Sequence, residues 1–241
     1  MKREMKLFNQ YVKQFDLKNK DIMYKFHHSY RVMEISKEIA KSLKLNEEDT
    51  YIATLAGLLH DIGRFNQVKE YKTFNDSMSV DHGDEGERVL KENDFIKEFT
   101  TDGKIIDIII KSTKYHNKYK LDENIDEKTL LFCKIVRDAD KLDIMMEQCN
   151  EIVQNEIILK KELLDSLYNK TLCLNKDCNN EVDRILRIIG WIFDLNFKYS
   201  FNYLKDKKII VKKFNLLEIY GETEEINKLK QFINNEIEKR C

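Results

Sequence analysis

The chain has 241 residues, 42% of them hydrophobic and 35% charged, a composition typical of a globular protein with a buried core rather than a disordered one. Lysine and arginine (42 residues) nearly balance aspartate and glutamate (43), so no whole-chain charge attracts nucleic acid or an anionic membrane. The longest apolar runs, near Leu55–Leu59 and Ile105–Ile110, are too short to span a bilayer. The N-terminal residues lack the apolar segment of a signal peptide, so none is predicted.

The cysteines favour a reducing compartment. They are Cys133, Cys149, Cys173, Cys178 and Cys241, an odd number at irregular spacing. This pattern argues against a disulfide framework, and Cys173 and Cys178 lack the second close pair that is typical of a structural zinc site. We interpret Cys133 and Cys149 as small core residues and expect a cytoplasmic protein.

The whole chain is predicted to be almost entirely helical, because proline is absent and glycine occurs only seven times. Helices are expected over residues 1–20, 21–43 and 46–63. Asn46 has the character of an N-cap, and Gly63 that of a helix stop. Residues 64–82 are predicted to form a loop with little regular structure, of a length that is often functional.

Helices are also predicted for the rest of the chain. They are expected over residues 83–92, 95–99, 103–116 and 127–148, followed by three or four amphipathic helices between about 151 and 241. We interpret the basic stretch Lys205–Lys213 as a solvated face, with nucleic-acid binding as the alternative. Without a repeat or a linker, residues 1–241 are predicted to be one domain, with a core at about 20–150 and a helical C-terminal extension at about 151–241.

Three histidines lie at positions that suggest chemistry. His60 is followed directly by Asp61 at the end of a predicted helix, so two metal-binding side chains come from neighbouring positions. His82 and His116 each close a segment that leads into a polar stretch. A divalent ion that activates water needs imidazoles and carboxylates together with open coordination positions.

Two further side chains lie on apolar helix faces. His28 is one turn before Val32 on the stripe of its predicted helix, whereas His27 points about 100° away and is predicted to lie at the surface. Asp140 is one turn beyond Val136 on an apolar face, where a carboxylate is costly unless a metal or a cation pairs with it. Ligands spread over several helices are typical of a metal site inside a helical bundle.

These residues, in this order, resemble the HD-domain superfamily of metal-dependent phosphohydrolases. The strings that carry the resemblance are HSYRV at 28–32, LLHDIGRF at 58–65 and RDADKLDI at 137–144, together with DHGDEGERVL at 81–90 and KYHNK at 114–118. The last two are similar to the additional histidine segments of two-metal members, and the resemblance covers about residues 20–150. It implies an all-α HD-domain helical bundle with additional C-terminal helices. It also implies a stand-alone enzyme that hydrolyses a nucleotide or other small phosphoester through a metal-activated water.

The resemblance implies a role for each matched residue. His28, His60, Asp61 and Asp140 correspond to the four ligands of the first metal. In two-metal members Asp61 would bridge the ions, with His82 and His116 on the second. His82 and His116 have an alternative interpretation as a phosphate contact or a general acid.

Asp140 also has an alternative interpretation, as a structural acid paired with Arg137 or Lys141. Asp138 falls on a different helix face. Asp143, one turn beyond Asp140, is the better candidate for a carboxylate that supports a ligand.

The catalytic candidates are Asp61, Arg64 and Lys141. Arg64 follows Asp61 by three residues, so its guanidinium could clamp a phosphate from the same helix face. Its alternative interpretation is a cation that the dipole favours at a helix C-terminus. Lys141 is a second candidate for a phosphate contact, and Asp84 and Glu85 are weaker candidates for supporting carboxylates or general bases.

Mixed nitrogen and oxygen ligation suits one or two divalent ions of manganese, iron, nickel, cobalt or zinc better than magnesium. The chain lacks the GYP segment of cyclic-di-GMP phosphodiesterases and the HDxxED arrangement of alarmone hydrolases. We therefore expect a small phosphoester or a nucleotide as the partner, with no membrane or nucleic acid, and leave a homodimer open. Two alternatives remain: an HD-type di-iron oxygenase, and a non-catalytic metal-binding sensor module.

Overall fold

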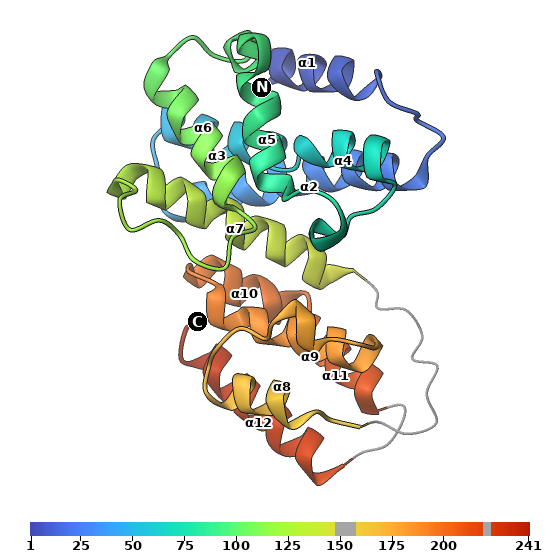
Figure 1. The fold of residues 1–241 in the computed structure, drawn as a ribbon. Helices are drawn as coiled ribbons and strands as arrows, with labels where there is room; N and C mark the ends of the chain where they lie inside the picture. Colours follow the sequence, from blue (N-terminus) through green and yellow to red (C-terminus); the bar gives the residue numbers. More distant parts are fainter. Residues whose placement is uncertain (148–157, 219–222) are drawn as a thin grey trace. The chain divides into compact units, whose positions relative to one another are not determined.

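The computed structural model describes residues 1–147, 158–218 and 223–241, which divide into two compact units, Met1–Asp143 and Ile144–Cys241 (Figure 1). Throughout the described residues the regular structure is helical, and this confirms the all-α prediction. Among these residues, no helix is both long enough and apolar enough to cross a membrane. The prediction of one domain with a C-terminal extension stays a prediction.

The first unit contains the helices that carry the candidate site. They are α1 (Lys2–Val12), α2 (Lys20–Ser42), α3 (Glu47–Leu59), α4 (Gly63–Tyr71), α5 (His82–Lys91), α6 (Gly103–Tyr115) and α7 (Glu127–Met146), with the 3-10 turns η1 (Asp76–Met78) and η2 (Glu92–Glu98). The residues of α7 up to Asp143 belong to this unit. These bounds agree with most of the predicted helices.

Asparagine and aspartate caps fix where several of these helices begin. The side chain of Asn46 accepts a hydrogen bond from the backbone N–H of Asp49, which confirms the predicted N-cap of α3. Asp81 accepts from the N–H groups of Gly83 and Asp84, so α5 begins at His82. The caps therefore place one candidate ligand in the first turn of its helix.

The predicted loop at residues 64–82 is wrong over its first half, because α4 occupies Gly63–Tyr71. Two of its side chains, Phe65 and Val68, are buried one turn apart and anchor the helix to the core. This apolar face was too short to be recognised as a helical pattern in the sequence. The predicted helix over residues 1–20 is also too long, since α1 ends at Val12.

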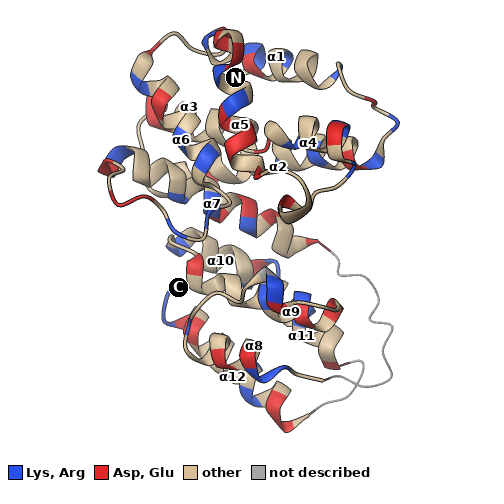
Figure 2. Ribbon diagram, viewed as in Figure 1, with Lys and Arg blue, Asp and Glu red and all other residues tan. Residues whose placement is uncertain are grey.

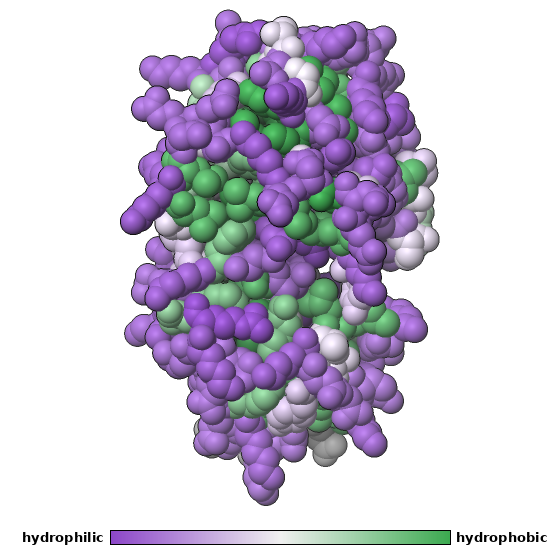
Figure 3. Space-filling view, turned by 90° about the vertical axis from the view of Figure 1, so that its left-hand side faces the viewer, coloured by the Kyte–Doolittle hydropathy of each residue, from purple (hydrophilic) through white to green (hydrophobic). Residues whose placement is uncertain are grey.

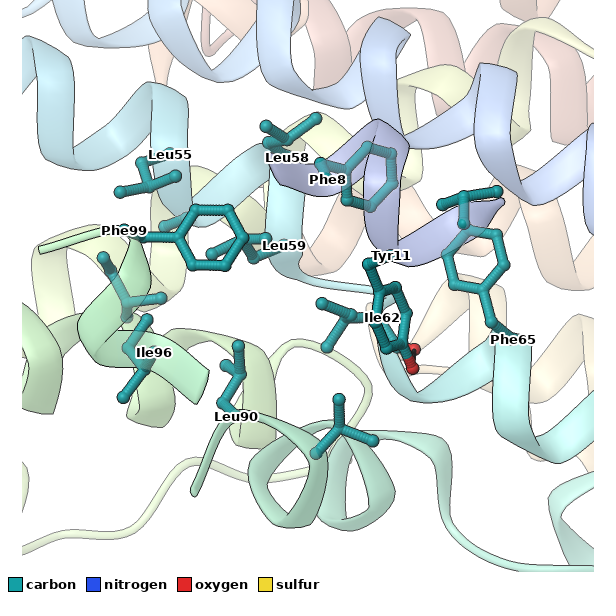
Figure 4. Close-up of a cluster of buried hydrophobic side chains, with 14 of the residues drawn as sticks. Phe8, Tyr11, Leu55, Leu58, Leu59, Ile62, Phe65, Leu90, Ile96 and Phe99 are labelled. Carbon is teal, nitrogen blue, oxygen red and sulfur yellow. Dashed lines mark hydrogen bonds between the residues drawn. The ribbon is translucent and has the colours of Figure 1, made fainter. Parts of the chain in front are cut away.

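The core of the first unit includes the segment that joins α3 to α4, since Leu59, Ile62 and Phe65 belong to its cluster of buried side chains (Figure 4). The ring of Phe65 packs edge-on against Phe8 and Tyr11, with ring centroids 5.8 and 6.0 Å apart. The Tyr11 hydroxyl donates a hydrogen bond to the carbonyl oxygen of Ile62 at 3.4 Å. Burial of these rings therefore holds in place the turn in which Asp61 lies.

Gly63 is not a helix stop but the point where α4 approaches α5. A Cβ atom added at Gly63 would lie 2.5 Å from the backbone nitrogen of Gly86 and 2.6 Å from the carbonyl oxygen of His82. Both neighbours are backbone atoms, so they cannot move aside as a flexible side chain would. The missing side chain therefore allows His82 to approach the turn that carries Asp61.

We expect Gly63→Ala to lower the free energy of unfolding by about 1–3 kcal/mol, because α4 and α5 must separate to admit the methyl group. Chemical denaturation of the purified variant would measure this change. Gly103→Ala is the matched control, since no heavy atom lies within 4 Å of the added Cβ there. Equal stabilities for the two variants would contradict the proposed close approach.

The second unit has five α-helices in its described residues, where three or four were predicted. They are α8 (Lys161–Tyr168), α9 (Glu181–Gly190), α10 (Lys198–Asp206), α11 (Ile209–Glu218) and α12 (Glu224–Glu238), with the 3-10 turns η3 (Asn175–Asp177) and η4 (Trp191–Asp194). The predicted helix end at 148, Cys149 and the first residues of the predicted extension lie outside the described residues.

The basic stretch Lys205–Lys213 is exposed in part. Lys213 is buried, and its ammonium donates a hydrogen bond to the carbonyl oxygen of Glu147. Lys205, Lys207, Lys208 and Lys212 are exposed. Basic and acidic residues are both scattered over the helices (Figure 2). Hydrophobic residues form patches on the largely hydrophilic face drawn in Figure 3.

Candidate metal centre

The first unit brings together the six side chains that the sequence analysis assigned to metal binding. They are His28 of α2, His60 and Asp61 of the turn between α3 and α4, His82 of α5, His116 directly after α6, and Asp140 of α7. The side chains of His28 and His60 are fully buried, and Asp61 is 1% exposed. By contrast His27 is exposed, which confirms its predicted surface position.

One group of four, the first half-site, consists of His28, His60, Asp61 and Asp140. In this half-site, the Nε2 atom of His28 lies 3.2 Å from His60 Nε2, 3.1 Å from Asp140 Oδ1 and 3.4 Å from Asp61 Oδ2. The Nε2 atom of His60 lies 3.5 Å from the same Asp61 oxygen and 3.6 Å from Asp140 Oδ1. Four donor atoms from three parts of the chain thus face a common point.

A second half-site, formed by His82, His116 and Asp61, uses the other oxygen of the same carboxylate. The Nε2 atoms of His82 and His116 are 3.0 Å apart. They lie 3.7 and 3.4 Å from Asp61 Oδ1. Asp61 therefore lies between the two half-sites and presents one carboxylate oxygen to each.

Hydrogen bonds assign the proton of each neutral imidazole to Nδ1. In all four rings this nitrogen lies 2.6–2.8 Å from an oxygen that can only accept. The acceptors are Asp143 Oδ2 for His28, the Gly57 carbonyl for His60, Asp76 Oδ2 for His82 and the Thr113 carbonyl for His116. In the neutral rings, every Nε2 lone pair is consequently directed toward Asp61, as in metal-binding histidines.

The donor set fits one or two divalent ions. The Nε2 atoms of His82 and His116 face each other as lone pairs, and Asp61 Oδ1 is buried without a hydrogen-bond donor among the described residues. Acceptors this close repel one another unless a cation lies between them. Two ligands bound at about 2.1 Å lie about 3.0–3.4 Å apart, close to the spacings in both half-sites.

Protonation differs between the half-sites. Burial alone would lower the pKa of His28, but contacts with Asp140, Asp143 and Asp61 raise it to about 10. The pKa of His60 is also raised, because neighbouring Asp61 and Asp140 outweigh burial. Without a metal, the first half-site therefore holds protons as its counter-charge.

In the second half-site, burial favours the neutral form of both imidazoles. Burial lowers the pKa of His82 to about 4, even though its contact with Asp76 acts in the opposite direction. Burial also lowers the pKa of His116. The ring of His82 therefore keeps its Nε2 lone pair free at neutral and mildly acidic pH, and burial favours the same neutral form of His116.

Ion binding should release protons unequally. At pH 6 an ion entering the first half-site must displace a proton from His28, whereas one entering the second displaces none from His82. Affinity for the first ion should rise with pH toward about 10, whereas protonation of His82 should weaken binding of the second ion only as the pH falls toward about 4. Calorimetric titration in two buffers of different ionisation enthalpy measures the number of protons released by each ion. The titration is made at pH 6, which lies below the pKa of about 7 that ion-bound water reaches. Equal release for the two ions would contradict the assignment.

Lys25 is a component of the site that the sequence analysis missed. Its ammonium lies 2.6 Å from Asp61 Oδ2, and the residue is only 6% exposed. The ammonium also lies 5.5 Å from the ring centroids of Tyr24 and Phe74. Its spacing of three residues from His28, on the same helix face, was the available signal.

The loop between α4 and α5 contributes a second missed residue, Asp76. Its Oδ2 lies 2.6 Å from His82 Nδ1, and its Oδ1 accepts hydrogen bonds from Arg64 Nη1 and Gln67 Nε2, each at 2.9 Å. Nη1 of Arg64 also donates to the Phe74 carbonyl at 2.8 Å. Arg64 thus holds the loop, while its predicted phosphate contact stays a prediction.

The other candidates have distinct surroundings. Asp143, favoured from the sequence as the partner of a ligand, also accepts hydrogen bonds from Arg31 at 2.7 and 2.9 Å. Asp84 pairs with Lys118, and Glu85 accepts from Arg88 and Asn66, so these carboxylates are engaged with other side chains. Lys141 is buried next to Asp140 in α7, and its role as a phosphate contact stays a prediction.

Arg137, considered from the sequence as a partner of Asp140, supports the segment after α6. Its Nη1 donates to the carbonyl oxygens of Tyr115, His116 and Lys118 at 2.9, 3.1 and 2.6 Å. These bonds satisfy carbonyl groups at the end of the helix. Arg137 therefore fixes the backbone of one candidate ligand.

Comparison with known proteins gives one result. Residues 26–145 match the family model described as HD domain. No curated protein and no solved structure matches the chain. The matched segment begins two residues before His28 and ends five residues after Asp140, so it contains both half-sites.

Proposed function

Residues 26–145 belong to the HD-domain family, and from this premise we propose that the chain is a two-metal phosphohydrolase. The observation that carries the proposal is the convergence of four imidazole Nε2 atoms on the two oxygens of Asp61. A shared carboxylate between two nitrogen-rich half-sites is suited to a pair of ions that act on one substrate. The proposed substrate is a nucleotide or another small phosphoester.

Each half-site would hold one ion. The first offers two imidazoles and two carboxylates, and the second offers two imidazoles and the shared carboxylate. Such ligand sets favour manganese, iron, nickel, cobalt or zinc over magnesium. The chemistry that these ions supply when bound is activation of a water and neutralisation of charge on the phosphoryl oxygens.

The protein's own groups have three tasks in this proposal. Asp61 fixes the separation of the half-sites, because its two oxygens belong to one rigid group. The carboxylates of Asp143 and Asp76 hold the imidazoles of His28 and His82 in the required tautomer. The buried ammonium of Lys25 supplies a positive charge beside the shared carboxylate, where a phosphate would bind.

Asp61→Asn should lower kcat/KM for phosphate release by at least about 100-fold, because it removes charge shared by both half-sites. A screen of nucleotides and simple phosphoesters with metal-loaded protein measures this loss, and elemental analysis counts the ions in parallel. His27→Ala, at an exposed neighbour of His28, is the matched control and should keep full activity.

Wild-type protein that binds ions but hydrolyses no phosphoester would contradict the phosphohydrolase proposal. Oxygen consumption by the iron-loaded protein would then indicate the oxygenase. Absence of both activities would indicate a metal-binding sensor.

Lys25→Met should weaken inhibition by inorganic phosphate by about tenfold or more, since a charge-assisted contact is lost. Phosphate titration of the metal-saturated protein measures the effect, with ion content checked in each sample. Lys20→Met, at an exposed position in the first turn of α2, is the control and should leave inhibition unchanged. Phosphate inhibition that is equal in the Lys25 variant and wild type would remove Lys25 from the proposed phosphate site.

A further inference from the structure

We propose that Asp76 is the positioning residue of the second half-site, through which the loop between α4 and α5 controls binding of the second ion. The inference rests on the two-ion site proposed above. Among the described residues of the second half-site, His82 is the one whose side chain Asp76 contacts. Its effect on the ion would therefore act through the imidazole.

Two groups of opposite character face His82 Nδ1. Asp76 Oδ2 lies 2.6 Å away and can only accept, whereas Asn117 Nδ2 lies 3.2 Å away and can only donate. The shorter, charged contact assigns the proton to Nδ1 and leaves Nε2 free for an ion. Without the carboxylate, Asn117 would donate to Nδ1, and the ring proton would move to Nε2.

The other oxygen of Asp76 has a fixed environment. Arg64 Nη1 and Gln67 Nε2 both donate to Oδ1 at 2.9 Å. Gln67, which is fully buried, also donates to Ser79 Oγ and to the Val80 carbonyl. These bonds hold the loop against α4 and fix which oxygen of Asp76 faces His82.

This environment makes Asp76→Asn a sharp test. The new amide would place its oxygen toward the two donors, Arg64 and Gln67, and its NH2 group toward His82 Nδ1. Both groups facing Nδ1, the new amide and Asn117, would then be donors. The variant should therefore put a proton on the nitrogen that binds the ion while keeping almost the same shape.

The histidines of the first half-site are oriented by groups outside this loop. His28 is oriented by Asp143 of α7, and His60 by the Gly57 carbonyl of α3. The candidate ligands of the first half-site lie in or next to the helices α2, α3 and α7. The two ions should consequently respond differently to a change in Asp76.

The test is a Co2+ titration of metal-free wild type, Asp76→Asn and His82→Ala, followed by calorimetry and visible absorption. We expect Asp76→Asn to weaken only the second ion, by about 10–100-fold, and His82→Ala to abolish it. Nitrogen NMR of the metal-free proteins should show the His82 proton on Nδ1 in wild type and on Nε2 in Asp76→Asn. A merely structural role would not produce this change of tautomer.

Asp107→Asn is the matched control. It makes the same change in charge at an exposed residue of α6 whose carboxylate pairs with Lys111 rather than with a residue of either half-site. We expect this variant to bind both ions as wild type does. Asp76→Ala is the second variant if Asp76→Asn does not fold, because Asn117 alone would then face Nδ1.

The outcomes separate the two proposals. Wild-type protein that binds fewer than two ions would overturn the two-ion site. Two ions bound with wild-type affinity by a folded Asp76 variant, with the His82 proton still on Nδ1, would overturn only the role of Asp76. Loss of both ions from a folded variant would also overturn it, since the effect would not be specific to the second half-site.

Discussion

Burial of the Asp61 carboxylate is the constraint on which the rest of the site depends. A carboxylate that is 1% exposed is costly unless positive or donor groups surround it. One oxygen lies 2.6 Å from the Lys25 ammonium, and both oxygens face imidazole Nε2 atoms. The pKa of Asp61 is well below its usual range, because these neighbours outweigh the effect of burial. The surrounding helices must therefore bring positively charged or hydrogen-bond donor groups to this one carboxylate.

The two half-sites meet this requirement in different ways. The first combines His28 and Asp140 from two long helices with His60, and protons on its histidines balance its carboxylates in the absence of a metal. The second lies where glycines let short helices come close, and burial favours the neutral form of both of its imidazoles. The single carboxylate of Asp61 thus lies between a half-site whose histidines carry protons and one whose imidazoles favour the neutral form, so the two differ in how they respond to pH.

The supporting residues connect the site to the rest of the unit. Tyr11 of the core bonds to the turn that carries Asp61, and Arg137 holds the backbone after α6. The loop between α4 and α5 is tied to α4 through Arg64 and Gln67. Positions several residues away from the ligands therefore fix the imidazole rings, which is why substitutions outside the ligand set are informative about the site.

The sequence by itself determined the all-helical fold, the matched family segment and the six side chains that converge on the site. Local signals were sufficient for these, because capping residues, helical periodicity and the order of short motifs are properties of neighbouring residues. Only the tertiary structure decided that Lys25 meets Asp61, that Asp76 meets His82 and that Gly63 meets Gly86. A lysine on a helix, an aspartate in a loop and a glycine after a helix have common local explanations. Their partners lie up to 36 residues away, and contacts over such separations depend on how the helices pack.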